Sequence, residues 1–507
     1  MRALEIVLSF ANALALAGCA VRRFRGGRPT VFAGLMAASS AGLQALLEGP
    51  RWQMVPAYAL AAVLLLVGLV GIFWADRIRV AARAGERAGA RAAVSGIGLG
   101  TLALALSIAL PIALPVFGFP KPTGPFAIGT ETLHWIDTGR RELFSSDPED
   151  RRELVARVWY PARDGPSAPR ASYMEDADLV TIAMARIVHL PSFLLSQLRY
   201  VTTHAVRGAA VADGSPTYPV LIFLSGLGGF SGSNTFQAEE LVSRGYVVVG
   251  LDQPGGSAGL RLADGRTATV PPREQIQALI QQSTSPASKV PILNGHALPD
   301  GIIPYFAQDL SVSIDQLTAL NHRDPKDRRA DPLAGRLDLE SLGVFGISLG
   351  AIVTGEACLR DARVKAALMM DAAMPADVVR TGLRQPCIWI SRPASDMRLE
   401  RSRSGGWPES SITETLATMW AVFDAHKPGS AYYLDMPGMF HVNFTDAPFW
   451  SPLTVWLGLT GPVDGARMWR IVNAYTVAFF DEYLKGRQEP LLDGPAGQRP
   501  EVRLSRR

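Results

Sequence analysis

The fold that this sequence predicts is decided by one stretch, Leu342-Gly343-Val344-Phe345-Gly346-Ile347-Ser348-Leu349-Gly350-Ala351-Ile352-Val353. Its first four residues form a short apolar run that is typical of a buried strand, and its last residues begin a helical pattern. Between them lies Gly-x-Ser-x-Gly, the pattern of a sharp strand-to-helix turn that exposes a nucleophilic serine. Glycine is expected at 346 and 350 because a side chain there would block the turn. The stretch therefore predicts Ser348 as a nucleophile.

Short apolar runs alternate with longer amphipathic segments through residues 120–507. The runs predict strands, and the segments between them predict helices. The predicted strands are 131–137, 154–160, 219–224, 246–251, 364–370, 387–391 and 431–434, and the predicted helices are 237–244, 305–320, 413–425 and 468–484. This alternation favours an α/β class domain with a doubly wound, mostly parallel sheet and catalytic loops at the strand ends.

The first 119 of the 507 residues differ sharply in composition from the rest. Four long apolar stretches lie there, at 6–21, 30–47, 54–74 and 94–119. The third and fourth contain no charged residue, and they are long enough to cross a bilayer. The sequence therefore predicts an all-α transmembrane region of about four helices over 1–119, followed by a catalytic domain over 120–507.

Arginines cluster in two of the loops between these stretches. They are Arg22, Arg23, Arg25 and Arg28 after the first, and Arg77, Arg79, Arg83, Arg87 and Arg91 after the third. The positive-inside rule places both loops in the cytoplasm, so four spans leave the catalytic domain on the periplasmic or extracellular side of a bacterial inner membrane. Three spans would leave it in the cytoplasm.

The net charge of +4 follows from this region, because residues 1–119 carry 11 Arg and 4 acidic residues. The basic balance therefore reflects membrane topology, and nucleic acid is not expected as a partner. The sequence suggests no oligomeric state.

Three cysteines leave two questions open. Leu16-Ala17-Gly18-Cys19 resembles the cleavage box of a bacterial lipoprotein, but the arginines that follow it favour an uncleaved first span. Cys358 and Cys387 could form one bridge outside the cytoplasm, although two buried thiols are the favoured interpretation.

A serine nucleophile needs a base and an orienting acid, which follow it in the chain order Ser, acid, His. Only His426 and His441 come late enough. His441 follows the last predicted strand in a loop, whereas His426 precedes Lys-Pro-Gly and is expected at a solvated helix end. Two acids remain open at this point, Asp371 at the end of one predicted strand and Asp396 beyond the next.

The nucleophile also needs backbone N–H groups that stabilise an oxyanion. One should be the N–H of Leu349, directly after the serine. The other is expected from the glycine-rich loop Ser225-Gly226-Leu227-Gly228-Gly229-Phe230, which also suits an ordinary strand-to-helix connection.

Residues 125–490 resemble the platelet-activating-factor acetylhydrolase family of α/β-hydrolases, the group that includes lipoprotein-associated phospholipase A2. The resemblance rests on motifs in the expected order: the strand and loop at 219–230, the elbow at 346–350, an Ala-Leu-x-x-Asp strand ending at Asp371, and His-x-x-Phe-x-Asp at 441–446. It implies the α/β-hydrolase fold. It also implies a triad of Ser348, Asp371 and His441, with Asp371 preferred to Asp396, and an oxyanion N–H on Leu227.

The same resemblance implies a serine hydrolase that cleaves a carboxylic ester. The four predicted spans lie outside the resemblance and are expected to anchor this hydrolase in the membrane. The expected substrate is a lipid or other hydrophobic ester, such as a phospholipid with a short or oxidised acyl chain, and no metal or cofactor is expected. Ile347 stands where the family has histidine, and a change at the pocket rim is expected there. Residues 178–201 could form an interfacial lid that admits lipid, but a helical cover that packs over the pocket is the favoured interpretation. The alternative is an altered hydrolase-fold membrane protein with a binding or scaffolding role.

Overall fold

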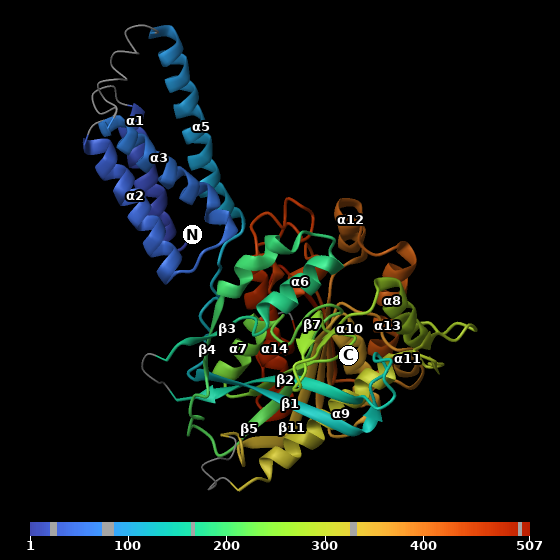
Figure 1. Ribbon diagram of the computed structural model, residues 1–507. Helices are drawn as coiled ribbons and strands as arrows, with labels where there is room; N and C mark the ends of the chain where they lie inside the picture. Colours follow the sequence, from blue (N-terminus) through green and yellow to red (C-terminus); the bar gives the residue numbers. More distant parts are fainter. Residues whose placement is uncertain (21–27, 74–85, 164–167, 325–331, 495–498) are drawn as a thin grey trace. The chain divides into compact units, whose positions relative to one another are not determined.

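The computed structural model describes residues 1–20, 28–73, 86–163, 168–324, 332–494 and 499–507 (Figure 1). The chain divides into two compact units. The first holds residues 1–117 together with 196–200 and 450–453, and the second holds the remainder.

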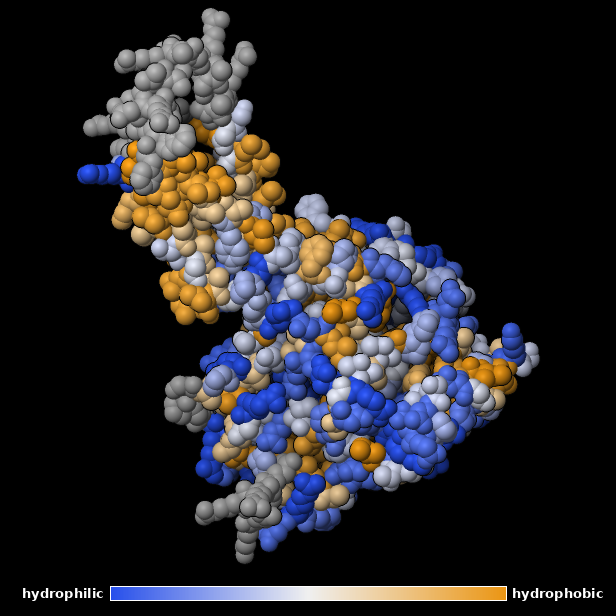
Figure 2. All heavy atoms as spheres, viewed as in Figure 1, coloured by the Kyte–Doolittle hydropathy of each residue, from blue (hydrophilic) through white to orange (hydrophobic). Residues whose placement is uncertain are grey.

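Four apolar helices make up most of the first unit. They are α1 (Ala3–Ala20), α2 (Arg28–Leu47), α3 (Val55–Phe73) and α5 (Glu86–Ala113). Each is long and apolar enough to cross a membrane, and Figure 2 shows hydrophobic side chains over their surface. The arginines at 22–25 and 77–83, on which the predicted topology depends, lie outside the described residues.

Glycines allow two of these helices to approach closely. A Cβ on Gly34 of α2 would lie 2.8 Å from the Leu65 Cα of α3, and one on Gly68 of α3 would lie 3.0 Å from the Val31 Cα. Small residues at such crossings are common where helices associate in lipid.

A buried ion pair also holds the first unit together. Arg51, just before the short helix η2 (Trp52–Met54), donates from Nε and Nη2 to Glu5 at 2.8 and 2.7 Å. Its Nη1 reaches the carbonyl of Leu114 at 2.7 Å. Both charged side chains are buried, which is tolerable because each has a partner.

The second unit is built on an 11-stranded sheet in the order β15-β14-β13-β12-β11-β5-β6-β2-β1-β4-β3. The six strands from β14 to β6 run parallel to one another. They are β5 (Tyr218–Leu224), β6 (Val247–Asp252), β11 (Leu337–Ile347), β12 (Ala366–Met370), β13 (Cys387–Ser391) and β14 (Ala431–Asp435). The remainder are β1 (Ala127–Arg141), β2 (Arg151–Ala162), β3 (Arg170–Ser172), β4 (Thr202–Arg207) and β15 (Arg503–Arg506). The prediction of a mostly parallel sheet is confirmed.

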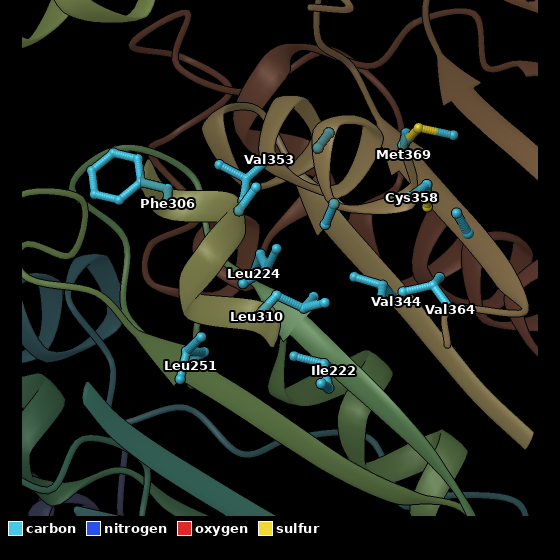
Figure 3. Packing of buried hydrophobic residues seen from close by; sticks show 14 of the residues in the cluster. Ile222, Leu224, Leu251, Phe306, Leu310, Val344, Val353, Cys358, Val364 and Met369 are labelled. Carbon is cyan, nitrogen blue, oxygen red and sulfur yellow. The ribbon is translucent and has the colours of Figure 1, made fainter. Parts of the chain in front are cut away.

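Helices cover both faces of this sheet, and side chains alternate between them. Ile222 and Leu224 of β5 pack in one cluster with α9 (Ile303–Asn321), α10 (Leu349–Arg360) and α13 (Glu409–Ala425); Figure 3 shows part of it. On the other face, α7 (Thr235–Ser243) contacts α14 (Gly465–Lys485). There Phe345 of β11 contacts both Phe223 of β5 and Phe480 of α14. Because helices cover both faces, successive side chains of these strands are all buried, which explains the continuous apolar runs in the sequence.

The register of the parallel strands brings their carboxyl ends to one edge. Gly346 pairs with Leu224, and Ile347 pairs with Met370. The segments that follow β5, β11 and β12 therefore begin side by side. The thiols of Cys358 and Cys387 are free and buried, as the favoured interpretation predicts.

Candidate active site

Ser348 occupies a strained turn between β11 and α10. Its backbone angles are φ 55° and ψ −123°, a conformation that costs an L-residue on the order of 1–3 kcal/mol. A Cβ on Gly346 would lie 2.4 Å from the carbonyl carbon of Gly350, and one on Gly350 would lie 1.9 Å from the Leu224 oxygen. Alanine does not fit at either glycine. The packing of β5 against the turn holds Ser348 in its strained, partly exposed position.

Two backbone N–H groups near Ser348 have no hydrogen-bond acceptor among the residues that the structure describes. Leu349 is the first residue of α10, where an N–H has no partner within the helix. The glycine-rich loop lies against the serine, since a Cβ on Gly226 would be 3.2 Å from the Ser348 Cβ. In that loop Gly228 and Gly229 donate to backbone oxygens, whereas the N–H of Leu227 meets no acceptor in the described part of the chain.

Asp371 and His441 are in direct contact. Asp371 follows β12, and its N–H donates to the Ile390 carbonyl of β13 at 3.0 Å. Nδ1 of His441 lies 2.7 Å from Oδ2 of Asp371. The carboxylate is fully buried, and the imidazole side chain is 21% exposed. An acid held in this way can orient the ring and stabilise its charged form.

The backbone of Ser348 is hydrogen-bonded at the same edge of the sheet as Asp371. Its N–H donates to the Met370 carbonyl, directly before Asp371, at 2.9 Å. In the described structure Ser348 Oγ makes no hydrogen bond to His441. That bond is often long in an enzyme without substrate and shortens when substrate binds.

The environment of Asp371 keeps its carboxyl group ionised. Burial alone would raise its pKa, but the charge of Arg392 and the contact with His441 outweigh burial and hold the pKa at about 2. Arg392 donates from Nε to Oδ2 at 2.9 Å, and Ser391 donates to Oδ1 at 2.9 Å. The carboxylate is therefore a fixed acceptor at neutral pH.

The competing acid and the competing histidine lie elsewhere. Asp396, in the first turn of α12 (Ala394–Ser404), accepts from the Gly438 N–H at 2.6 Å and makes no contact with an imidazole in the described residues. His426 is only 3% exposed, so its expected place at a solvated helix end is wrong. Burial lowers its pKa to about 4, and its ring packs against Trp389.

Ile347 also departs from expectation. Its side chain is 1% exposed, so it packs inside the domain and does not line an exposed rim. Side chains along β11 point alternately to the two layers of helices, and Ile347, the last residue of this strand, still points into one of them. The predicted change at the rim from this position is wrong.

Sequence reasoning missed several side chains that support the histidine loop. Asn443 accepts from the N–H groups of Phe440 at 2.8 Å and Gly461 at 2.7 Å. Asp446 accepts from Thr235 at 2.9 Å and Phe236 at 3.2 Å, at the start of α7. The motif at 441–446 contains both side chains, so the sequence holds a signal for them, but the partners of Asp446 are more than 200 positions away.

A separate cavity of about 420 Å³ lies in the second unit, lined in part by Arg157, Phe230 and Asp252. None of Ser348, Asp371 and His441 lines it, so it is not the space in front of the serine. Within the described ranges no group of three or more His, Cys, Asp or Glu side chains is arranged to hold a metal ion.

Comparison with known proteins identifies the chemistry. No family model matches the chain. It is 25% identical over 410 residues to a probable 1-alkyl-2-acetylglycerophosphocholine esterase of Arthroderma benhamiae, covering 76% of this chain and 93% of that protein. The structure also resembles a ferulic acid esterase from Streptomyces cinnamoneus, with a TM-score of 0.57 and 25% identity over 77% of this chain and 99% of that one. The protein is a carboxylic ester hydrolase.

The hydrolase is similar to platelet-activating-factor acetylhydrolases, as the motifs at 219–230, 346–350 and 441–446 predict. Its mostly parallel sheet and its structural neighbour are consistent with an α/β-hydrolase fold. The two relatives cover about three quarters of the hydrolase, and four apolar helices lie at its N-terminus.

Proposed function

We propose that the hydrolase is a membrane-anchored serine esterase whose triad is Ser348, Asp371 and His441. The observation that carries this proposal is the 2.7 Å contact between Asp371 and His441, at the edge of the sheet where Ser348 is held in its strained turn. The alternative, an altered hydrolase domain used for binding, would be favoured by a missing triad member. All three residues are present.

The proposed mechanism assigns one task to each group. His441, oriented by Asp371, takes the proton of Ser348 Oγ as the oxygen attacks the ester carbonyl. The N–H groups of Leu349 and Leu227 stabilise the oxyanion, and a donor of this kind contributes about 3–4 kcal/mol in a comparable enzyme. His441 then gives its proton to the leaving alcohol, which leaves the acyl group on Ser348. Water attacks this acyl-enzyme as His441 takes a proton from the water, and His441 returns the proton to Ser348 Oγ as the acid is released.

A lipid ester is the substrate class that we propose. The relative from Arthroderma benhamiae is named for an acetylated glycerophosphocholine, which supports a phospholipid with a short acyl chain. The surface adds a second argument, because the loop after the histidine exposes Val455, Trp456, Leu457 and Leu459, with Trp456 88% exposed. Exposed aromatic and apolar side chains in one segment mark a contact with a partner or a membrane.

Shortening this loop's apolar side chains should affect esters held in a bilayer more than soluble ones. We expect the double variant Trp456→Ser, Leu457→Ser to hydrolyse a vesicle-embedded phospholipid ester about tenfold more slowly, because less of the enzyme engages the lipid surface. Hydrolysis of p-nitrophenyl acetate should stay within twofold of the wild-type rate. Ile292→Ser removes another apolar side chain, 65% exposed, and serves as the control. An equal loss on both substrates would contradict a lipid surface.

The four helices of the first unit are proposed to span a bacterial inner membrane, with the second unit on the outer side. Their length and apolar composition support spanning, and the arginine-rich loops support this orientation. Alkaline phosphatase fused after Arg507 of the full chain should be active in a bacterial host, because that reporter folds only outside the cytoplasm. A fusion after residue 85 should be inactive. If only the fusion after residue 85 were active, the orientation in the membrane would be the opposite of the one proposed.

A further inference from the structure

A buried arginine competes with the histidine for the carboxylate of the proposed triad. Oδ2 of Asp371 accepts both from His441 Nδ1 at 2.7 Å and from Arg392 Nε at 2.9 Å. The Arg392 side chain is completely buried, and its Nη2 has no acceptor among the described residues. A cation placed here would oppose the positive charge that His441 acquires during catalysis.

A second acid offsets this cation. Glu400 of α12 pairs with Nη1 of Arg392, and its other oxygen accepts from the His441 backbone N–H at 3.4 Å. Glu400 is 7% exposed, so solvent screens the pair only weakly. Trp407 covers the group, with its ring centroid 5.3 Å from Arg392 Cζ and 4.8 Å from the His441 ring.

Two anions and one cation surround the imidazole of His441. Asp371 and Glu400 are negative and Arg392 is positive, so the cluster carries one net negative charge while His441 is neutral. It becomes neutral when His441 accepts the serine proton. Without Glu400, Arg392 would cancel the charge of Asp371 and leave the imidazolium without a net counter-charge.

We propose that Arg392 and Glu400 are a matched pair of positioning residues: Arg392 fixes the carboxylate of Asp371, and Glu400 restores the negative charge that His441 needs as a base. The inference rests on the proposed triad. The inference also extends the triad, because neither Arg392 nor Glu400 touches the serine. Arg392 is the first residue after β13 and belongs to none of the motifs found in the sequence.

Other groups facing the cluster carry little charge at neutral pH or have their own partners. Ser391 donates to Asp371, and burial raises the pKa of Tyr433, which lies beside Ser391. Asp396 on α12 is engaged by the Gly438 N–H. Arg392 and Glu400 are therefore the two groups whose removal should change the field at His441 most.

The test is the pH dependence of kcat/KM for p-nitrophenyl acetate, measured on the full chain in detergent or nanodiscs. Arg392→Gln removes the cation and should move the acidic limb up by about one pH unit, because an imidazolium is then favoured. Glu400→Gln removes an anion and should move the same limb down by a similar amount. The double variant should return within about 0.3 pH unit of the wild type, because the two changes cancel.

Arg398→Gln and Glu409→Gln are the matched controls, because they break an exposed pair at the same helix and should leave the limb in place. Arg392→Lys keeps the charge and should keep the wild-type limb, which supports the proposal even if Arg392→Gln fails to fold. Shifts of the same sign in both glutamine variants, or no shift in Glu400→Gln, would overturn it. If the proposed triad itself were wrong, the result would be different, because Ser348→Ala would then retain activity.

Discussion

Replacement of Ser348 by alanine is expected to lower kcat for a p-nitrophenyl ester by roughly four to six orders of magnitude. Removing the nucleophile of a serine hydrolase has an effect of this size, and the residual rate comes from substrate binding and oxyanion stabilisation. Because the amides of Leu349 and Leu227 remain, KM should change little. Steady-state kinetics of the purified full chain measure both values.

Ser341→Ala provides the control for this experiment. Ser341 lies on the same strand β11, but it is far from the carboxyl edge where Ser348 lies. Its loss should leave kcat within twofold of the wild-type value. A Ser348→Ala protein that hydrolyses the ester at a rate close to wild type would rule out the proposed triad.

Asp371→Asn is expected to lower kcat by about 10⁴-fold with little change in overall fold. An amide at this position cannot stabilise the imidazolium, and it favours the wrong tautomer of His441; the equivalent change in a serine protease has an effect of this size. The change also removes one of the two anionic partners of the buried Arg392, so the melting temperature should fall. Kinetics and thermal unfolding of the same preparation separate the two effects.

Asp396→Asn is the matched comparison, since it makes the same chemical change in the first turn of α12, which follows the neighbouring strand. Asp396 accepts one hydrogen bond from Gly438, and the asparagine oxygen can keep that bond. We expect kcat to fall by less than about tenfold, because at most one hydrogen bond to the Gly438 backbone is weakened. If Asp396→Asn were instead the variant with the 10⁴-fold loss, the acid of the triad would be Asp396.

Much of the second unit could be predicted from local patterns. Apolar runs such as 219–224 and 387–391 become central strands, because a strand that is buried on both faces needs apolar side chains at successive positions. Gly346 and Gly350 could be explained from the turn alone, and the structure shows which atoms exclude a side chain. The favoured interpretation of Cys358 and Cys387 as two buried thiols is also confirmed.

Burial of single polar side chains could not be predicted in this way. His426 precedes Lys-Pro-Gly, which is typical of a solvent-exposed helix end, yet it is buried and its ring packs against Trp389 of β13. Arg392 has a charge that sequence patterns assign to the surface, and it is completely buried because Asp371 and Glu400 both pair with it. Each outcome depends on contacts between elements distant in the chain.

Local sequence was therefore enough to place a nucleophile at Ser348, because the glycine-flanked turn and the strand and helix around it are made by neighbouring residues. The strain at Ser348, the contact of Asp371 with His441 across 70 positions, and the buried pair of Arg392 and Glu400 depend on tertiary structure. The physical reason is that parallel strands bring their ends together only after the sheet has formed. The sequence alone therefore does not show which charged side chains come together at that edge.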